Sequence, residues 1–139
     1  MSRLKTPALY TNVVLNSAPV SLNSHQRNLG TIAMTEADFE MTATKVIEDF
    51  AEAIDEALGD RLDADIQGGI LTITMPGLGQ YVINKHRPNR EIWVSSPFSG
   101  AAHFRLSEGK WMSTRDNTIE LAPLLSSEMA SKYGITVSL

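Results

Sequence analysis

The chain has 139 residues, of which 42% are hydrophobic and 20% are charged, so it can bury one core and is not a wholly disordered chain. It has no cysteine, which excludes disulfide frameworks, thiolate zinc sites and a cysteine nucleophile. No apolar run approaches the roughly 20 residues that span a bilayer, and the net charge of -4 argues against a general nucleic-acid binder.

The negative charge is concentrated in one part of the chain. Residues 1–33 carry three basic residues and no acid, whereas residues 34–65 carry eleven acids and two bases. A stretch without acids and with scattered Arg, Lys and Ser is typical of organelle targeting peptides. We expect residues 1–33 to be a targeting peptide or a disordered extension, and residues 34–139 to form the folded domain. An alternative is that translation starts at Met34.

A long amphipathic helix is expected to begin near Thr35, which together with Asp38 has the form of a capping box. Gly59 is placed to end this helix. Apolar residues at helical spacing would form one stripe, made of Phe39, Ala43, Val46, Phe50, Ile54 and Ala57. The opposite stripe is almost purely acidic and contains Asp38, Glu48, Asp49, Glu52, Asp55 and Glu56.

Short runs of strand-forming residues follow, separated by turn residues. The expected strands span residues 63–67, 70–75, 80–85, 90–96, 102–106 and 110–113. Gly68 and Gly69 would form a tight hairpin turn between the first two strands. Closely spaced hairpins of this kind indicate an antiparallel sheet.

A second helix is expected over residues 119–133, because Leu121, Leu125 and Met129 recur at helical spacing and Gly134 is a plausible C-cap. All strands are consecutive and lie between the two helices. This order predicts an α+β fold, a two-layer α-β sandwich in which both helices pack on one face of an antiparallel sheet.

The acidic stripe has two interpretations. Like charges four residues apart, such as Glu48 with Glu52 and Glu52 with Glu56, each cost about a few tenths of a kcal/mol. The face can simply be solvated, as charged faces usually are. It can also be a surface for hard cations such as Mg²⁺, Ca²⁺, Mn²⁺ and iron, which prefer carboxylate oxygens. A metal held there without His would be weakly bound, with water completing its coordination.

Trp93 is the most conspicuous residue of the expected sheet. Strand alternation places Ile92 and Val94 on the helix-covered face and Trp93 on the open face. Two interpretations remain: partial burial by neighbouring side chains, or a protein-binding anchor, because Trp is enriched at interface hot spots. The sequence contains no GxGxxG, P-loop, HExxH or GxSxG motif, so nucleophilic catalysis has no support.

Several runs of residues resemble the signature of the frataxin family. They are YVINK at residues 81–85, PNREIWVSSP at residues 88–97, GGILT at residues 68–72 and the His-Phe pair at residues 103–104. The acidic helix resembles the acidic ridge of that family. The resemblance covers about residues 36–133.

The resemblance implies a frataxin-like domain that acts as an iron-binding regulator, or iron chaperone, of iron-sulfur cluster assembly. Its partners would be a cysteine desulfurase and an iron-sulfur scaffold protein. Ferrous and ferric iron would bind weakly to a surface that we call the acidic ridge, carried over to Glu48, Asp49, Glu52, Asp55, Glu56, Asp60, Asp63 and Asp65. The partner-binding residues would be Asn84, Pro88, Asn89, Trp93, Ser96 and His103.

The resemblance also leaves alternatives open. A ferroxidase reaction on the acidic ridge, or iron storage by oligomerisation, would make the protein an enzyme or a store. The first expectation is a monomeric regulator without nucleic-acid or membrane partners. The compartment depends on residues 1–33: the mitochondrial matrix if they are a cleaved targeting peptide, or a bacterial cytoplasm if they are not. His103 agrees with bacterial members of the family and departs from the basic residue of animal members.

Overall fold

The computed structural model describes residues 34–139, and Glu36–Leu139 form one compact unit. The expectation for residues 1–33 therefore lies outside the described residues. The unit contains, in chain order, α3 (Glu36–Leu58), β1 (Asp63–Gln67), β2 (Ile70–Met75), β3 (Gly79–His86), β4 (Glu91–Ser96), β5 (Gly100–Ser107), β6 (Lys110–Ser113) and α4 (Leu121–Tyr133). Neither helix in this part of the chain is both long enough and apolar enough to cross a membrane.

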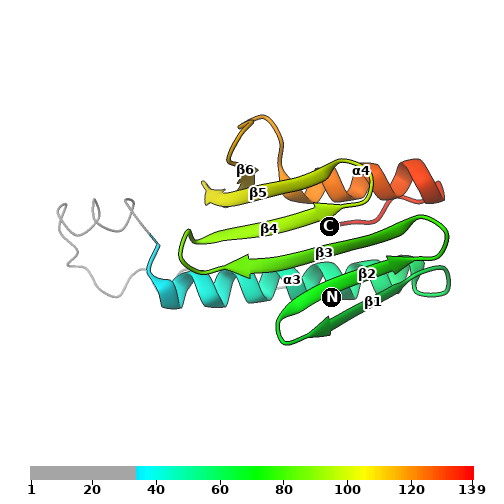
Figure 1. Ribbon diagram of the computed structural model, residues 1–139, viewed down its shortest axis with the longest axis horizontal. Coiled ribbons are helices and arrows are strands. Elements are labelled where there is room, and N and C mark those ends of the chain that lie inside the picture. Colours follow the sequence, from blue (N-terminus) through cyan, green and yellow to red (C-terminus); the bar gives the residue numbers. More distant parts are fainter. Residues whose placement is uncertain (1–33) are drawn as a thin grey trace. The chain divides into compact units, whose positions relative to one another are not determined.

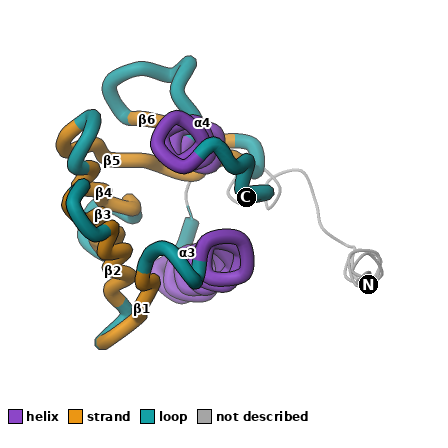
Figure 2. The backbone as a smooth tube through the Cα atoms, turned by 90° about the vertical axis from the view of Figure 1, so that its right-hand side faces the viewer, coloured by secondary structure: helices purple, strands orange, loops and turns teal. Residues whose placement is uncertain are grey.

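The six strands form one sheet in which each strand pairs antiparallel with the next in the chain. In Figure 1 the sheet lies in front of α3 and α4. Figure 2 shows both helices on the same side of the sheet, which leaves the other face uncovered. We call this uncovered side the open face. The arrangement confirms the expected two-layer α+β sandwich.

Each expected strand is present, and its ends agree with the prediction to within two residues. Two boundaries differ for backbone reasons. Arg90 ends the turn before β4 instead of opening that strand, because its φ of 55° lies in the left-handed region. Glu120 precedes α4 instead of belonging to it, because its backbone is extended and bridges to Met112.

The core lies between the helices and the covered face of the sheet. From α3 it receives Phe39, Ala43, Ile47, Phe50, Ile54 and Leu58. The prediction named Val46 and Ala57, which are only half-buried, in place of Ile47 and Leu58. The buried positions of α3 are mostly four residues apart. At two places the buried residue is therefore the one that directly follows the predicted residue: Ile47 after Val46, and Leu58 after Ala57. Ile92 and Val94 are buried as expected.

Helix α3 is tied to β3 by a group of ionic contacts. Lys85 Nζ lies 2.8 Å from Glu40 Oε2 and donates a hydrogen bond to Thr44 Oγ1 at 2.8 Å. Arg87 Nε lies 2.8 Å from Glu40 Oε1. Hydrogen bonds from Arg87 and Lys85 lower the pKa of Glu40 to about 2. The side chain of Lys85 is only 13% exposed, so this pair is better shielded from water than an ordinary surface ion pair.

We expect Glu40→Gln to lower the free energy of unfolding at pH 7 by about 1 kcal/mol, because two cations lose their shared carboxylate. A lowered folded-state pKa stabilises the fold above the unfolded-state pKa, and this stabilisation disappears as the pH falls through the folded-state value. The wild type should therefore lose stability between about pH 4.5 and 2, and the variant should lose less over that range. Urea unfolding at several pH values measures both effects.

The matched control for this prediction is Lys45→Gln. Lys45 forms an exposed pair with Asp49 on α3, with side chains 76% and 55% exposed. Such a pair contributes little, so the control should change stability by less than about 0.5 kcal/mol. Equal effects of the two substitutions, or parallel pH profiles for Glu40→Gln and the wild type, would contradict the proposed role of Glu40.

Candidate functional site

All eight residues of the acidic ridge are exposed. Five of them line the solvent side of α3, because the other side of this helix supplies core residues: Glu48, Asp49, Glu52, Asp55 and Glu56. Asp49 pairs with Lys45 at 3.1 Å. The last turn of α3 contains no basic residue, so the acids near its C-terminus are unfavourably placed relative to the helix dipole.

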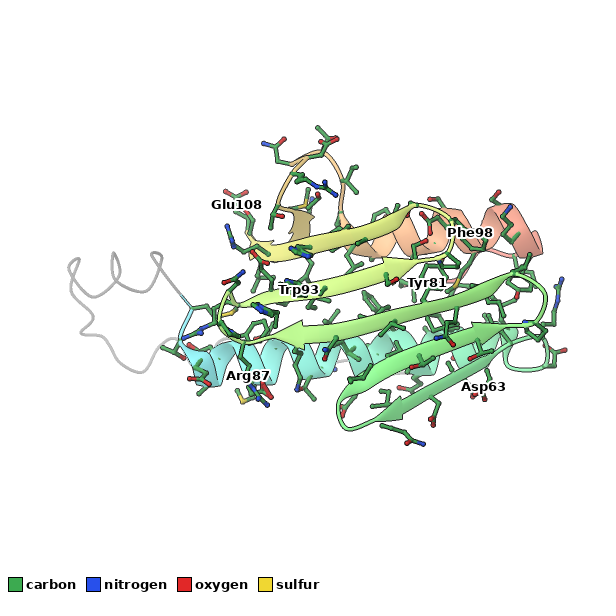
Figure 3. All side chains as sticks on the ribbon, viewed as in Figure 1. Asp63, Tyr81, Arg87, Trp93, Phe98 and Glu108 are labelled. Carbon is green, nitrogen blue, oxygen red and sulfur yellow. The ribbon has the colours of Figure 1, made fainter. Side chains whose placement is uncertain are left out.

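Asp63 and Asp65 belong to a second group of the acidic ridge. They pair opposite Thr74 and Thr72 and alternate with the half-buried Ala64 and Ile66, which places them on the open face of β1. Figure 3 shows Asp63 at the β1 side of the sheet. A shallow hollow of about 400 Å³ runs beside both carboxylates.

Asp60 lies in the turn between the two groups. Within residues 34–139, no three His, Asp or Glu side chains converge closely enough to hold a metal ion. The acidic ridge therefore presents carboxylates on α3, in a turn and on β1, and it has no closed coordination shell in this part of the chain. Its chemistry is that of dispersed oxygen ligands, which leave most coordination positions of a cation to water.

Trp93 lies on the open face, as expected (Figure 3), and is half-buried there. The imidazole of His86 stacks on it with ring centroids 3.8 Å apart and 7° between the planes. The imidazole of His103 stacks at 4.1 Å and 5°. His86 comes from β3 and His103 from β5, which flank β4, so the imidazoles cover opposite faces of the indole. We call His86, Trp93 and His103 the ring stack.

A buried carboxylate fixes the indole. Trp93 Nε1 donates to Glu91 Oε1 at 2.9 Å, Arg105 donates to Glu91 Oε2, and His103 Nδ1 lies 3.6 Å from Oε1. Glu91 is only 3% exposed although it lies on the open face. Burial raises the pKa of Glu91, but the hydrogen bonds from Trp93 and Arg105 outweigh burial and hold the pKa below its usual value. Glu91 is therefore an anion at neutral pH.

Of the two interpretations of Trp93, partial burial by neighbouring side chains is confirmed. Its role as an anchor stays a prediction. Glu91 was not among the predicted site residues, although alternation places it on the same face as Trp93. The contributions of His86 and Arg105 depend on strand register, because both residues pair opposite Glu91, one from β3 and the other from β5.

The expected partner-binding residues lie mostly together. Asn84 and His103 pair opposite Trp93 on the two neighbouring strands, and the side chain of His103 is 42% exposed. Pro88 and Asn89 are exposed in the turn between β3 and β4. We call these five residues the docking surface.

Ser96 stands apart from the docking surface and is only 6% exposed. Its hydroxyl donates to Glu128 Oε1 of α4 at 2.7 Å and accepts from the amides of Phe98 and Ser99. The hydroxyl of Tyr81 donates to the same Glu128 oxygen at 2.8 Å. Burial and this carboxylate both raise the pKa of Tyr81. Ser96 thus ties α4 to the covered side of the sheet, where a partner on the open face does not reach it.

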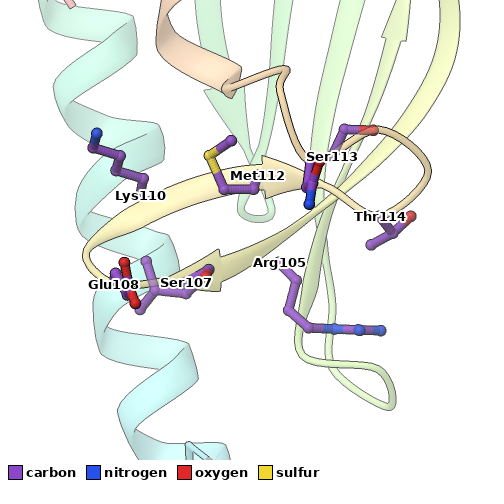
Figure 4. A pocket seen from close by; sticks show the side chains of 9 residues that line it. Arg105, Ser107, Glu108, Lys110, Met112, Ser113 and Thr114 are labelled. Carbon is purple, nitrogen blue, oxygen red and sulfur yellow. The ribbon is translucent and has the colours of Figure 1, made fainter.

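A hollow of about 600 Å³ opens beside the β5–β6 hairpin (Figure 4). Its lining includes Arg105, Glu108, Lys110 and Met112. None of the expected site residues lines it. Because Arg105 also holds Glu91, the hollow adjoins the ring stack on the open face.

Comparison with known proteins gives consistent matches. A family model described as "Frataxin-like domain" matches residues 32–135. "Frataxin homolog, mitochondrial" from Saccharomyces cerevisiae is 40% identical over 82 residues, which are 58% of this chain and 47% of the relative. "Iron-sulfur cluster assembly protein CyaY" from Neisseria meningitidis is 37% identical over 83 residues, which are 60% of this chain and 76% of the relative. The match thus spans about half of the length of the yeast relative.

Solved structures give the same fold. A frataxin from Psychromonas ingrahamii has a TM-score of 0.66 and 25% identity, and the match covers 76% of this chain and 97% of that one. Trimeric frataxin from Saccharomyces cerevisiae, described as complexed with ferrous, has a TM-score of 0.58 and 35% identity. This match covers 74% of this chain and 89% of the yeast chain.

Proposed function

This chain belongs to the frataxin-like domain family, and from that membership we propose that it binds iron weakly and regulates iron-sulfur cluster assembly on a cysteine desulfurase and scaffold complex. Curated relatives are named iron-sulfur cluster assembly proteins, and a yeast relative is described as complexed with ferrous. The observation that carries the proposal in this chain is the exposure of all eight acids of the acidic ridge.

Iron is the cargo in this proposal. Carboxylate oxygens are suitable ligands for Fe²⁺ and Fe³⁺, and exposed, dispersed carboxylates would hold such an ion with water in its remaining positions. A fixed two-iron centre needs several converging ligands, and residues 34–139 offer no group of three. Weak binding is therefore proposed ahead of ferroxidase activity.

The docking surface is the proposed contact with the desulfurase and scaffold complex. It combines residues of the open face, which neither helix covers (Figure 2), with the turn between β3 and β4, and it centres on a large aromatic residue of the kind enriched at hot spots. A mitochondrial matrix location is proposed by analogy with the yeast relative, whose name includes the word mitochondrial.

An anaerobic titration with Fe²⁺, followed by NMR, tests the iron-binding proposal. We expect the amide signals of α3 around Glu52 and of β1 around Asp63 to broaden first, because these segments carry the acidic ridge. Unchanged signals along both segments would refute the proposal. Glu108→Gln is the matched control, since it removes an exposed acid outside the acidic ridge and should leave the titration as in the wild type.

A further inference from the structure

The ring stack leaves little of Trp93 available to a partner. An indole contacts other molecules through its two π-faces, its N–H group or its apolar ring edge. Parallel imidazoles at 3.8 and 4.1 Å occupy both faces. The N–H group donates to Glu91, which is itself buried and held by Arg105. Since Trp93 as a whole is half-buried and not fully buried, elimination leaves the outer edge of the six-membered ring as its contact with a partner.

We propose that Trp93 meets its partner through this apolar ring edge, so that the partner supplies an aliphatic side chain there and not a stacked aromatic ring or a cation. The inference rests on the proposed docking to the desulfurase and scaffold complex and specifies the chemistry of that contact.

Charge around the ring stack supports this choice of occupant. On the open face, Glu91 of β4 pairs opposite His86 of β3 on one side and opposite Arg105 of β5 on the other. The three side chains therefore form one row across the sheet, next to Trp93. Glu91 is the acid of that row, and its carboxylate is buried and paired with Arg105, whose side chain is 61% exposed. A cationic partner residue would therefore approach an exposed guanidinium without an accessible carboxylate, which is unfavourable.

The ring stack also prepares Trp93 for binding. Two stacked imidazoles and one hydrogen bond hold the indole in a single orientation before a partner arrives. Such pre-organisation reduces the conformational entropy that binding must remove. A partner that stacked on the indole face would first have to displace His86 or His103. The two modes of contact therefore predict opposite effects of removing an imidazole.

Fluorine NMR on the full chain labelled with 5-fluorotryptophan tests the ring-edge contact, because the fluorine lies on that edge. The chain has two Trp residues, and Trp111 is 6% exposed and serves as an internal control. The Trp93 signal should differ between H₂O and D₂O in the free protein. This difference should disappear when the desulfurase and scaffold complex is added, whereas the Trp111 signal should not change.

The His86→Ala substitution distinguishes ring-edge contact from stacking. We expect it to weaken binding to the complex by about threefold to tenfold, since the indole loses part of its support. Unchanged or tighter binding would overturn the inference, because a stacking partner gains the face that His86 leaves. An unchanged Trp111 fluorine signal shows that the variant is folded.

The two proposals fail in different ways. If the complex binds the labelled protein while the Trp93 fluorine keeps its solvent dependence, docking stands and the ring-edge contact is wrong. If the complex does not bind the labelled protein or the unlabelled protein, the proposed docking is wrong and the ring-edge contact falls with it.

Discussion

Replacing Trp93 with alanine is expected to weaken binding to the desulfurase and scaffold complex at least about tenfold, which corresponds to about 1.4 kcal/mol. The residue is half-buried on the open face, and the core on the other side of the sheet does not depend on it. Glu91 keeps its contact with Arg105 when the indole is removed. The far-UV circular dichroism spectrum should therefore stay that of the wild type. Calorimetric titration of the complex measures the affinity.

Met41→Ala is the matched control for this variant. Met41 is a large apolar residue that is 70% exposed on α3, outside the docking surface and the acidic ridge. Its removal should change the affinity by less than about twofold. If Trp93→Ala bound as tightly as the control, the docking surface would be assigned to the wrong face.

Neutralising four acids of α3 together, as Gln at Glu48, Glu52 and Glu56 and Asn at Asp55, is expected to stabilise the fold while removing most Fe²⁺ binding. The substitutions relieve like-charge pairs along the helix, among them Glu48 with Glu52 and Glu52 with Glu56, and reduce the unfavourable charge near its C-terminus. The two effects together should raise the free energy of unfolding by about 1 to 2 kcal/mol. Thermal unfolding should shift upward by roughly 4 to 8 °C per kcal/mol for a domain of this size.

A control variant neutralises acids elsewhere, at Glu36, Glu108 and Glu120. Glu36 lies in the first turn of α3, where an acid is favourably placed relative to the helix dipole, so this variant should not gain stability. It should bind Fe²⁺ as the wild type does. A lower melting temperature for the α3 variant than for the wild type would contradict the electrostatic explanation of the stripe, whatever happened to its iron binding.

Local signals predicted most of the fold. The alternation in β4 placed Ile92 and Val94 in the core and Trp93 on the open face, and all three positions are confirmed. The same alternation places Ser96 with the buried residues, yet the resemblance included it among partner-binding residues. In α3 the predicted apolar stripe was correct except at Val46 and Ala57. The buried residues there are the following ones, Ile47 and Leu58, because buried positions along α3 are mostly four residues apart.

The sequence by itself determined which residues turn to solvent and which turn to the core, because helix and strand periods are properties of neighbouring residues in one chain. It thereby determined the exposed acids of α3 and the face that carries Trp93. Only the tertiary structure decided that Glu91 is buried and that two imidazoles enclose Trp93. These features depend on strand register and on the side of the sheet that the helices cover, which bring together side chains far apart in the chain.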